Sequence, residues 1–150
     1  MRRCLSVTLV VSLSAAGWAA GQEKKDGAVQ EDRKALEGKW KITSVTMAGK
    51  QIPVEKGPPF LEFKGDKFIG LAPGMTYKID PTKKPKHLDL IVTRDGKEIL
   101  TRAIYSLEQG GLTIGIPLVP KGKGVENQRP KSFGPGDMER PTMVLKAKRM

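Results

Sequence analysis

Cysteine and histidine are almost absent from this sequence, and their scarcity limits the chemistry open to the protein. The 150-residue chain contains one cysteine, Cys4, and one histidine, His87. Cys4 lies in an N-terminal segment that we expect to be removed, so the mature chain should form no disulfide and perform no thiolate chemistry. A zinc site needs several nitrogen or sulfur ligands, which His87 cannot supply alone. The acidic residues lack calcium-loop spacing, and the glycines form no phosphate-binding motif.

A catalytic role for His87 is also disfavoured. A histidine base needs a nucleophile and an orienting partner within reach. Strand alternation places His87 and Asp89 on the face opposite Leu88 and Leu90, so we expect both to be exposed to solvent. We therefore predict no catalytic residue, no metal, no cofactor and no enzymatic activity.

Long apolar runs are missing beyond the N-terminus. There, two arginines precede an apolar run over residues 5–13, and a group of small residues follows. This three-part pattern is typical of a secretory signal peptide, and the run is shorter than the roughly 20 residues that a spanning helix needs. We predict a signal peptide over 1–21, cleaved after Ala19 or Gly21. The protein is then exported to the periplasm, cell envelope or extracellular space and is not an integral membrane protein.

Negative charge is in short supply. The chain has 27 Lys and Arg against 16 Asp and Glu, a net charge of +11. Such a balance favours acidic surfaces and polymers through long-range attraction, although a soluble, lysine-rich surface is the simpler interpretation. Single-strand nucleic-acid readers interleave exposed aromatic with basic residues. Here the aromatic residues alternate with apolar ones and the lysines cluster in loops, so we predict no specific nucleic-acid binding.

The start of the mature chain is polar. Residues 22–29 predict a disordered spacer. Residues 31–37 contain good helix formers, and Gly38 stands where a helix commonly ends on a residue that tolerates positive φ. We predict a helix of one or two turns there, which leads into a single domain over 30–150.

The rest of the chain consists of strand-like segments separated by turn signals. Asp95-Gly96 is the strongest hairpin signal, and Pro53 weakens its strand or places it at an edge. A long irregular segment over 117–141 precedes the last strand. The predicted strands lie at about 39–47, 51–54, 60–64, 67–71, 75–80, 87–93, 99–107, 112–116 and 142–149.

We predict an all-β fold, an up-and-down antiparallel barrel of about eight strands with a short N-terminal helix. A meander of this length hides its edges most simply by closing on itself. Gly38-Lys39-Trp40 at the start of the first strand is the mark of small barrels of this kind, in which we expect Trp40 to close one end. A two-sheet sandwich has the same periodicity and stays an alternative.

Few aromatic residues are available to line a ligand cavity. The interior of an eight-stranded barrel is wide enough to be filled by side chains or to hold one small ligand. Core packing is the commoner role, and the candidates for lining a cavity are Phe63, Tyr77 and Tyr105.

A series of short motifs runs through nearly the whole mature chain. It comprises LEGKW at 36–40, GKQIP at 49–53, LEFKGDK at 61–67, YKIDPTKKPK at 77–86, IYSL at 104–107, RPKSF at 129–133 and VLKAKR at 144–149. On these motifs the chain resembles a lipocalin-like domain family of unknown function that is abundant in planctomycete bacteria. The match at 77–86 is specific, because a barrel needs no such loop on physical grounds. Gln109-Gly110-Gly111 departs from the family in one turn.

The resemblance implies a lipocalin-like barrel, usually exported, with no established activity and no catalytic residues to carry over. In lipocalins a basic side chain from the end of the last strand covers the Gly-x-Trp tryptophan, and here that residue would be Arg149. Arg149 shares a strand face with Leu145 and Ala147, which is the phase this contact requires. We therefore expect Gly38, Trp40 and Arg149 to close the barrel, with about 0.5–2 kcal/mol from the guanidinium on the indole.

Two functions fit these observations. The first is an exported, non-enzymatic lipocalin-like protein that binds a small apolar or amphipathic ligand. The second is a basic interaction module that binds an acidic partner or envelope polymer through loops 81–87 and 117–141. Protease inhibition through the long loop rests on fold analogy alone. We expect a monomer.

Trp40→Ala should lower the free energy of unfolding by about 3–5 kcal/mol, as truncation of a large buried aromatic residue does. Chemical denaturation followed by circular dichroism measures the change. An unchanged stability would mean that Trp40 is exposed and that the barrel interpretation is wrong.

Overall fold

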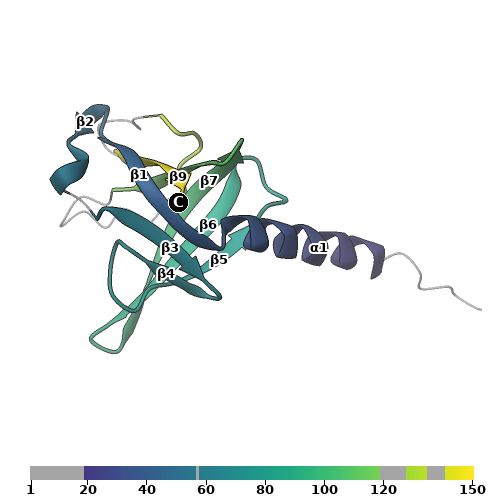
Figure 1. The fold of residues 1–150 in the computed structure, drawn as a ribbon. Coiled ribbons are helices and arrows are strands. Elements are labelled where there is room, and N and C mark those ends of the chain that lie inside the picture. Colours follow the sequence, from purple (N-terminus) through teal and green to yellow (C-terminus); the bar gives the residue numbers. More distant parts are fainter. Residues whose placement is uncertain (1–18, 57, 119–127, 135–140) are drawn as a thin grey trace, which may run out of the picture.

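The computed structural model describes residues 19–56, 58–118, 128–134 and 141–150. In this part of the chain one helix precedes the strands, and a 3-10 turn, η1 (Val54–Lys56), follows the second strand (Figure 1). The elements are α1 (Ala19–Leu36), β1 (Gly38–Met47), β2 (Lys50–Ile52), β3 (Phe60–Lys64), β4 (Lys67–Ile69), β5 (Thr76–Asp80), β6 (Lys86–Arg94), β7 (Lys97–Glu108), β8 (Gly111–Pro117) and β9 (Thr142–Arg149).

Eight of these strands form a closed antiparallel barrel in the order β1-β3-β4-β5-β6-β7-β8-β9, and β9 pairs back onto β1. The long β1 pairs with β3 near its start, with β2 near its end and with β9 along its other side. β2 is therefore an extra strand outside the barrel, and Pro53 follows it at an edge position. The predicted all-β barrel is confirmed.

Two tight turns set the register of β7 with its neighbours β6 and β8. Asp95 and Gly96 have φ of 52° and 73°, and Gln109 and Gly110 have φ of 43° and 77°. Positive φ at both central residues gives the type I′ turn, whose twist matches that of the strands it joins. The Asp95-Gly96 hairpin follows from the sequence.

Side chains pack the interior of the barrel. Phe63 meets Phe68 and Tyr77 edge to face, with ring centroids 4.9 and 5.0 Å apart. Edge-to-face contacts between aromatic rings stabilise the core beyond the free energy gained by burying the rings. The largest fully buried side chains are Trp40, Tyr105, Phe63, Phe68, Leu36, Leu61, Leu88, Leu90, Ile104, Leu112 and Ile114.

Trp40 lies where α1 meets the barrel. Its indole Nε1 donates a hydrogen bond of 2.7 Å to the carbonyl oxygen of Leu36. The guanidinium of Arg149 lies 5.0 Å from the centroid of the Trp40 ring and donates to the Ala35 carbonyl. Gly38 joins α1 to β1 with φ of 116°, which a residue without a β-carbon adopts without strain.

The N-terminal helix is longer than the sequence pattern indicated. α1 runs from Ala19 to Leu36 and projects from the barrel (Figure 1), so it includes residues 22–29, which we expected to be a disordered spacer. That expectation is corrected. Extending a formed helix requires no new nucleus, and Glu, Lys and Gln are good helix formers. The predicted signal peptide falls mainly on residues outside the described ranges and stays a prediction.

Gly70→Ala should destabilise the fold more than Gly74→Ala. Both glycines have positive φ, 130° and 70°. A β-carbon at Gly70 would lie 2.6 Å from the carbonyl oxygen of Phe60, whereas one at Gly74 meets nothing within 4 Å. Gly74→Ala therefore carries only backbone strain of about 1–2 kcal/mol, and Gly70→Ala adds about 1–3 kcal/mol of overpacking. Urea denaturation of both variants measures the difference, and equal losses would contradict the clash.

Candidate functional site

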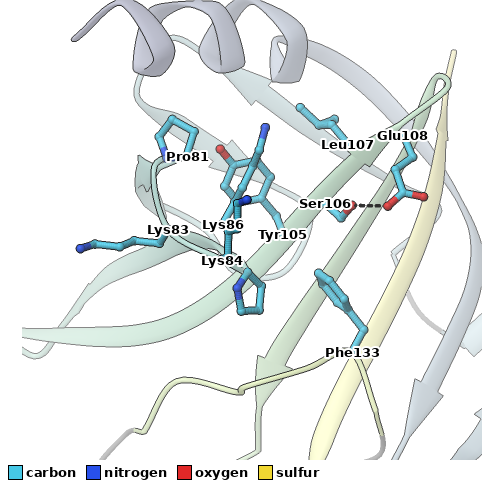
Figure 2. A pocket seen from close by; sticks show the side chains of 10 residues that line it. Pro81, Lys83, Lys84, Lys86, Tyr105, Ser106, Leu107, Glu108 and Phe133 are labelled. Carbon is cyan, nitrogen blue, oxygen red and sulfur yellow. Dashed lines mark hydrogen bonds between the residues drawn. The ribbon is translucent and has the colours of Figure 1, made fainter. Parts of the chain in front are cut away.

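A pocket forms where β7 extends beyond β6. The two strands pair from Arg94 and Lys97 to Lys86 and Tyr105, and β7 then continues to Glu108. The chain leading into β6 is the loop 81–85, which leaves space beside the end of β7. The resulting pocket has a volume of about 270 Å³ (Figure 2). Its lining consists of Pro81, Lys83, Lys84, Pro85, Lys86, Tyr105, Ser106, Leu107, Glu108 and Phe133.

The pocket lining combines apolar surface with positive charge. Two prolines, Leu107, Phe133 and the Tyr105 ring supply the apolar part, and three lysines come from the loop and the start of β6. Glu108 is the acidic residue of the lining, and its Oε1 accepts a hydrogen bond of 2.9 Å from Ser106 Oγ. This lining suits a ligand with an apolar body and an anionic group.

A polar cluster fastens α1 beside this pocket. Lys86 Nζ lies 2.7 Å from Asp32 Oδ2, and the hydroxyl of Tyr105 donates to the same oxygen at 2.6 Å. Asp32 belongs to α1, so one carboxylate joins the helix to both β6 and β7. Burial and the hydrogen bond to Asp32 raise the pKa of Tyr105 above its ordinary value near 10.

Segment 128–134 brings Phe133 to the pocket. Arg129 fixes this segment by donating to the carbonyl oxygens of Leu88 and Ala103 and to the carboxylate of Asp89. Phe133 packs over Gly115 of β8, where an added β-carbon would lie 3.4 Å from its ring. The missing side chain at Gly115 therefore leaves room for Phe133.

The same segment changes the surroundings of His87 and Asp89. Both are half-buried, so the expectation that they are exposed is wrong. Alternation along one strand identifies the outer face but not the segment that returns to cover it. Burial and the charge of Arg129 lower the pKa of His87.

The three aromatic candidates all belong to the packed core. Tyr105 is the one of the three that also lines the pocket. That any of them binds a ligand stays a prediction. Sequence reasoning missed Phe133, which comes from a segment distant in sequence. The basic loop was noted only as a surface for an acidic partner, although the specificity of the motif at 77–86 was a signal that this loop has a defined role.

Another hollow of about 270 Å³ lies where β4 and β5 diverge beyond their single residue pair, Lys67 and Thr76. Its lining is largely apolar, with Lys67 as its charged residue, so it offers fewer converging polar groups than the pocket beside β7.

Within the described ranges, no three or more His, Cys, Asp or Glu side chains gather in a group that could hold a metal ion. No helix in those ranges has the length and apolar character needed to cross a membrane.

No protein-family model, curated protein or solved structure matches this chain. The resemblance to the lipocalin-like family therefore stays a prediction from the sequence motifs, whereas the barrel rests on the strand pairing described above.

The stability of the protein should fall as the pH rises above about 10. The folded state holds the Tyr105 proton at a pH where the unfolded chain releases it, so each further rise favours unfolding. Burial raises the pKa of Tyr77 in the same direction. Tyr105→Phe should make this fall less steep but not abolish it. Urea denaturation across the alkaline range measures the slope, and equal slopes for parent and variant would refute the assignment.

Proposed function

We propose that this protein is a non-enzymatic binding protein that holds a small amphipathic anion in the pocket beside β7. The observation that carries the proposal is the meeting of an apolar wall and three lysines around one hollow of about 270 Å³. That volume lies near the lower end of small-molecule sites, about 300–1,000 Å³, so the ligand is small.

The packed barrel interior supports a site in the wall rather than inside the barrel. A ligand inside would have to displace large side chains such as Phe63 and Tyr77, which are almost fully buried and in mutual contact. Losing the packing of one such residue costs several kcal/mol. The pocket beside β7 requires no such displacement.

The lysines of the loop supply the charge selection. Lys83 and Lys84 are exposed and form no ion pair with any other residue that the structure describes. Lys86 is paired with Asp32, which offsets its charge, so the two loop lysines supply most of the selection for an anion. An anionic group at the rim gains up to about 1 kcal/mol from each exposed lysine, and the apolar body gains about 25 cal/mol for each Å² removed from water.

Export, membership of the lipocalin-like family and a monomeric state are part of the same proposal. The N-terminal signal pattern supports export, and the motifs from LEGKW to VLKAKR support the family. The alternative, a basic module that binds an acidic partner through its loops, stays a prediction. Loop 81–87 largely lines the pocket described here, and most of 117–141 lies outside the described residues.

Two probes with the same apolar body test the proposal, the anion 1-anilinonaphthalene-8-sulfonate and its neutral analogue N-phenyl-1-naphthylamine. Replacing both Lys83 and Lys84 by glutamine should lower the affinity for the anion by about tenfold, because two exposed ion pairs are worth up to about 2 kcal/mol. The affinity for the neutral probe should not change. Phe133→Ala should lower the affinity for both probes. Fluorescence titration measures each affinity.

The matched control replaces Lys34 and Lys78, two exposed lysines outside the pocket, by glutamine. It lowers the net charge equally and should leave both affinities unchanged. Absence of saturable binding by either probe would overturn the proposal. Binding that ignores both the lysine and the Phe133 substitutions would do so as well, because the ligand would then lie elsewhere.

A further inference from the structure

The outer face of β1 and β9 carries an unusual concentration of positive charge. Lys39 and Lys41 on β1 and Lys146 and Lys148 on β9 are exposed, while the residues between them on each strand point into the barrel and are buried. We call these four residues the lysine face. The outward positions of these strands from Lys39 to Thr43 and from Lys146 to Lys148 contain no acidic residue.

The lysine face places like charges opposite each other. Lys41 and Lys148 are directly opposite each other across the β1–β9 pairing, and like charges in that position are destabilising. None of the four forms an ion pair with an acidic residue in the described ranges. Alternate residues on a strand are about 7 Å apart, so the four ammonium groups form a short row of cations, and Glu62 of β3 lies in register with Lys39 at one end of it.

A hollow adjoins one end of this row. It has a volume of about 650 Å³ and is lined by Glu108, Gln109, Gly110, Gly111 and Lys148. Gly111 lies in register with Lys148, and Thr113 lies in register with Lys146. The neighbouring strand β8 therefore presents small side chains, which leave a shallow groove between the row of lysines and the hollow.

We propose that the lysine face and this hollow bind an extended acidic polysaccharide. The lysines meet its carboxylates, and Glu108 and Gln109 offer hydrogen-bonding groups to its hydroxyls. The glycines let the face of a sugar ring approach the backbone closely. Glu108 lines both this hollow and the pocket beside β7, but the lysines of the two sites lie on different segments. The proposal does not depend on the small ligand proposed for that pocket.

Two other classes of polyanion fit this face less well. Single-stranded nucleic acid binds by stacking on exposed aromatic rings, and Phe60, the aromatic residue in register with Lys41, is half-buried and lies 5.5 Å from the ammonium of Lys39. Phosphate recognition also favours the guanidinium fork over lysine. An acidic peptide that adds as a strand needs a free sheet edge, and the β1–β9 pairing leaves none at this face.

Polygalacturonate binding by the full chain tests the proposal. Replacing Lys41, Lys146 and Lys148 by glutamine should weaken binding at low salt by about tenfold or more. The binding constant of this variant should also fall less steeply with salt concentration, because fewer lysines then displace counterions from the polysaccharide. The matched control replaces Lys34, Lys50 and Lys78, which are exposed on other surfaces, and lowers the net charge equally. It should change the affinity by less than about twofold.

Three further readouts separate the outcomes. The melting temperature of the lysine-face variant should equal or exceed that of the parent, because the opposed charges are relieved, so lost binding would not reflect unfolding. Its affinity for 1-anilinonaphthalene-8-sulfonate should be unchanged. The proposal would be overturned if both triple variants lost affinity for polygalacturonate equally or if neither lost any. It would also be overturned if single-stranded DNA or polyglutamate bound more tightly than polygalacturonate.

Discussion

The pairing of β9 with β1 is the constraint on which the rest of this structure depends. It joins the two ends of a meander into a closed sheet and leaves only the short β2 as an added strand. Closure removes the free edges that would otherwise recruit other strands. It also brings Arg149, at the end of β9, over Trp40, at the start of β1, so the same pairing joins the sheet and covers one buried ring. The lysine face exists only because these two strands are neighbours.

The interior of the barrel is packed with side chains, which is why we propose binding sites on its outside. Aromatic rings in edge-to-face contact fill the space that a larger barrel would leave for a ligand. Hollows lie instead in the wall of the barrel, and two of them combine charge with space. One is at the end of β7 beyond its partner β6, and the other is beside the lysines next to β8. Both combine a local gap in side chains with positive charge, and they differ in shape. The first is smaller with a more apolar lining, and the second is larger with a more polar lining.

The polar cluster around Asp32 links the helix to the site. A carboxylate that accepts from both Lys86 and Tyr105 replaces the water that each group would lose at the helix–barrel junction. Lys86 thereby has two roles, since it fastens α1 and lines the pocket. The helix extends well beyond this contact, and Lys25 reaches Asp80 at 3.4 Å, close to the loop that lines the pocket.

The sequence by itself determined the strands, the Asp95-Gly96 hairpin, the end of the helix at Gly38 and the inward face that carries Trp40, because alternation and turn chemistry are local properties of the chain. Only the tertiary structure decided that the meander closes as a barrel, that Arg129 covers Asp89 and that Phe133 completes a pocket with the loop lysines. These features join segments that are far apart in sequence. The periodicity of a strand indicates which face a side chain lies on, but it does not indicate which distant segment covers that face. The length of α1 escaped sequence analysis for a related reason, since its polar first half is a helix that continues from a second half held by the barrel.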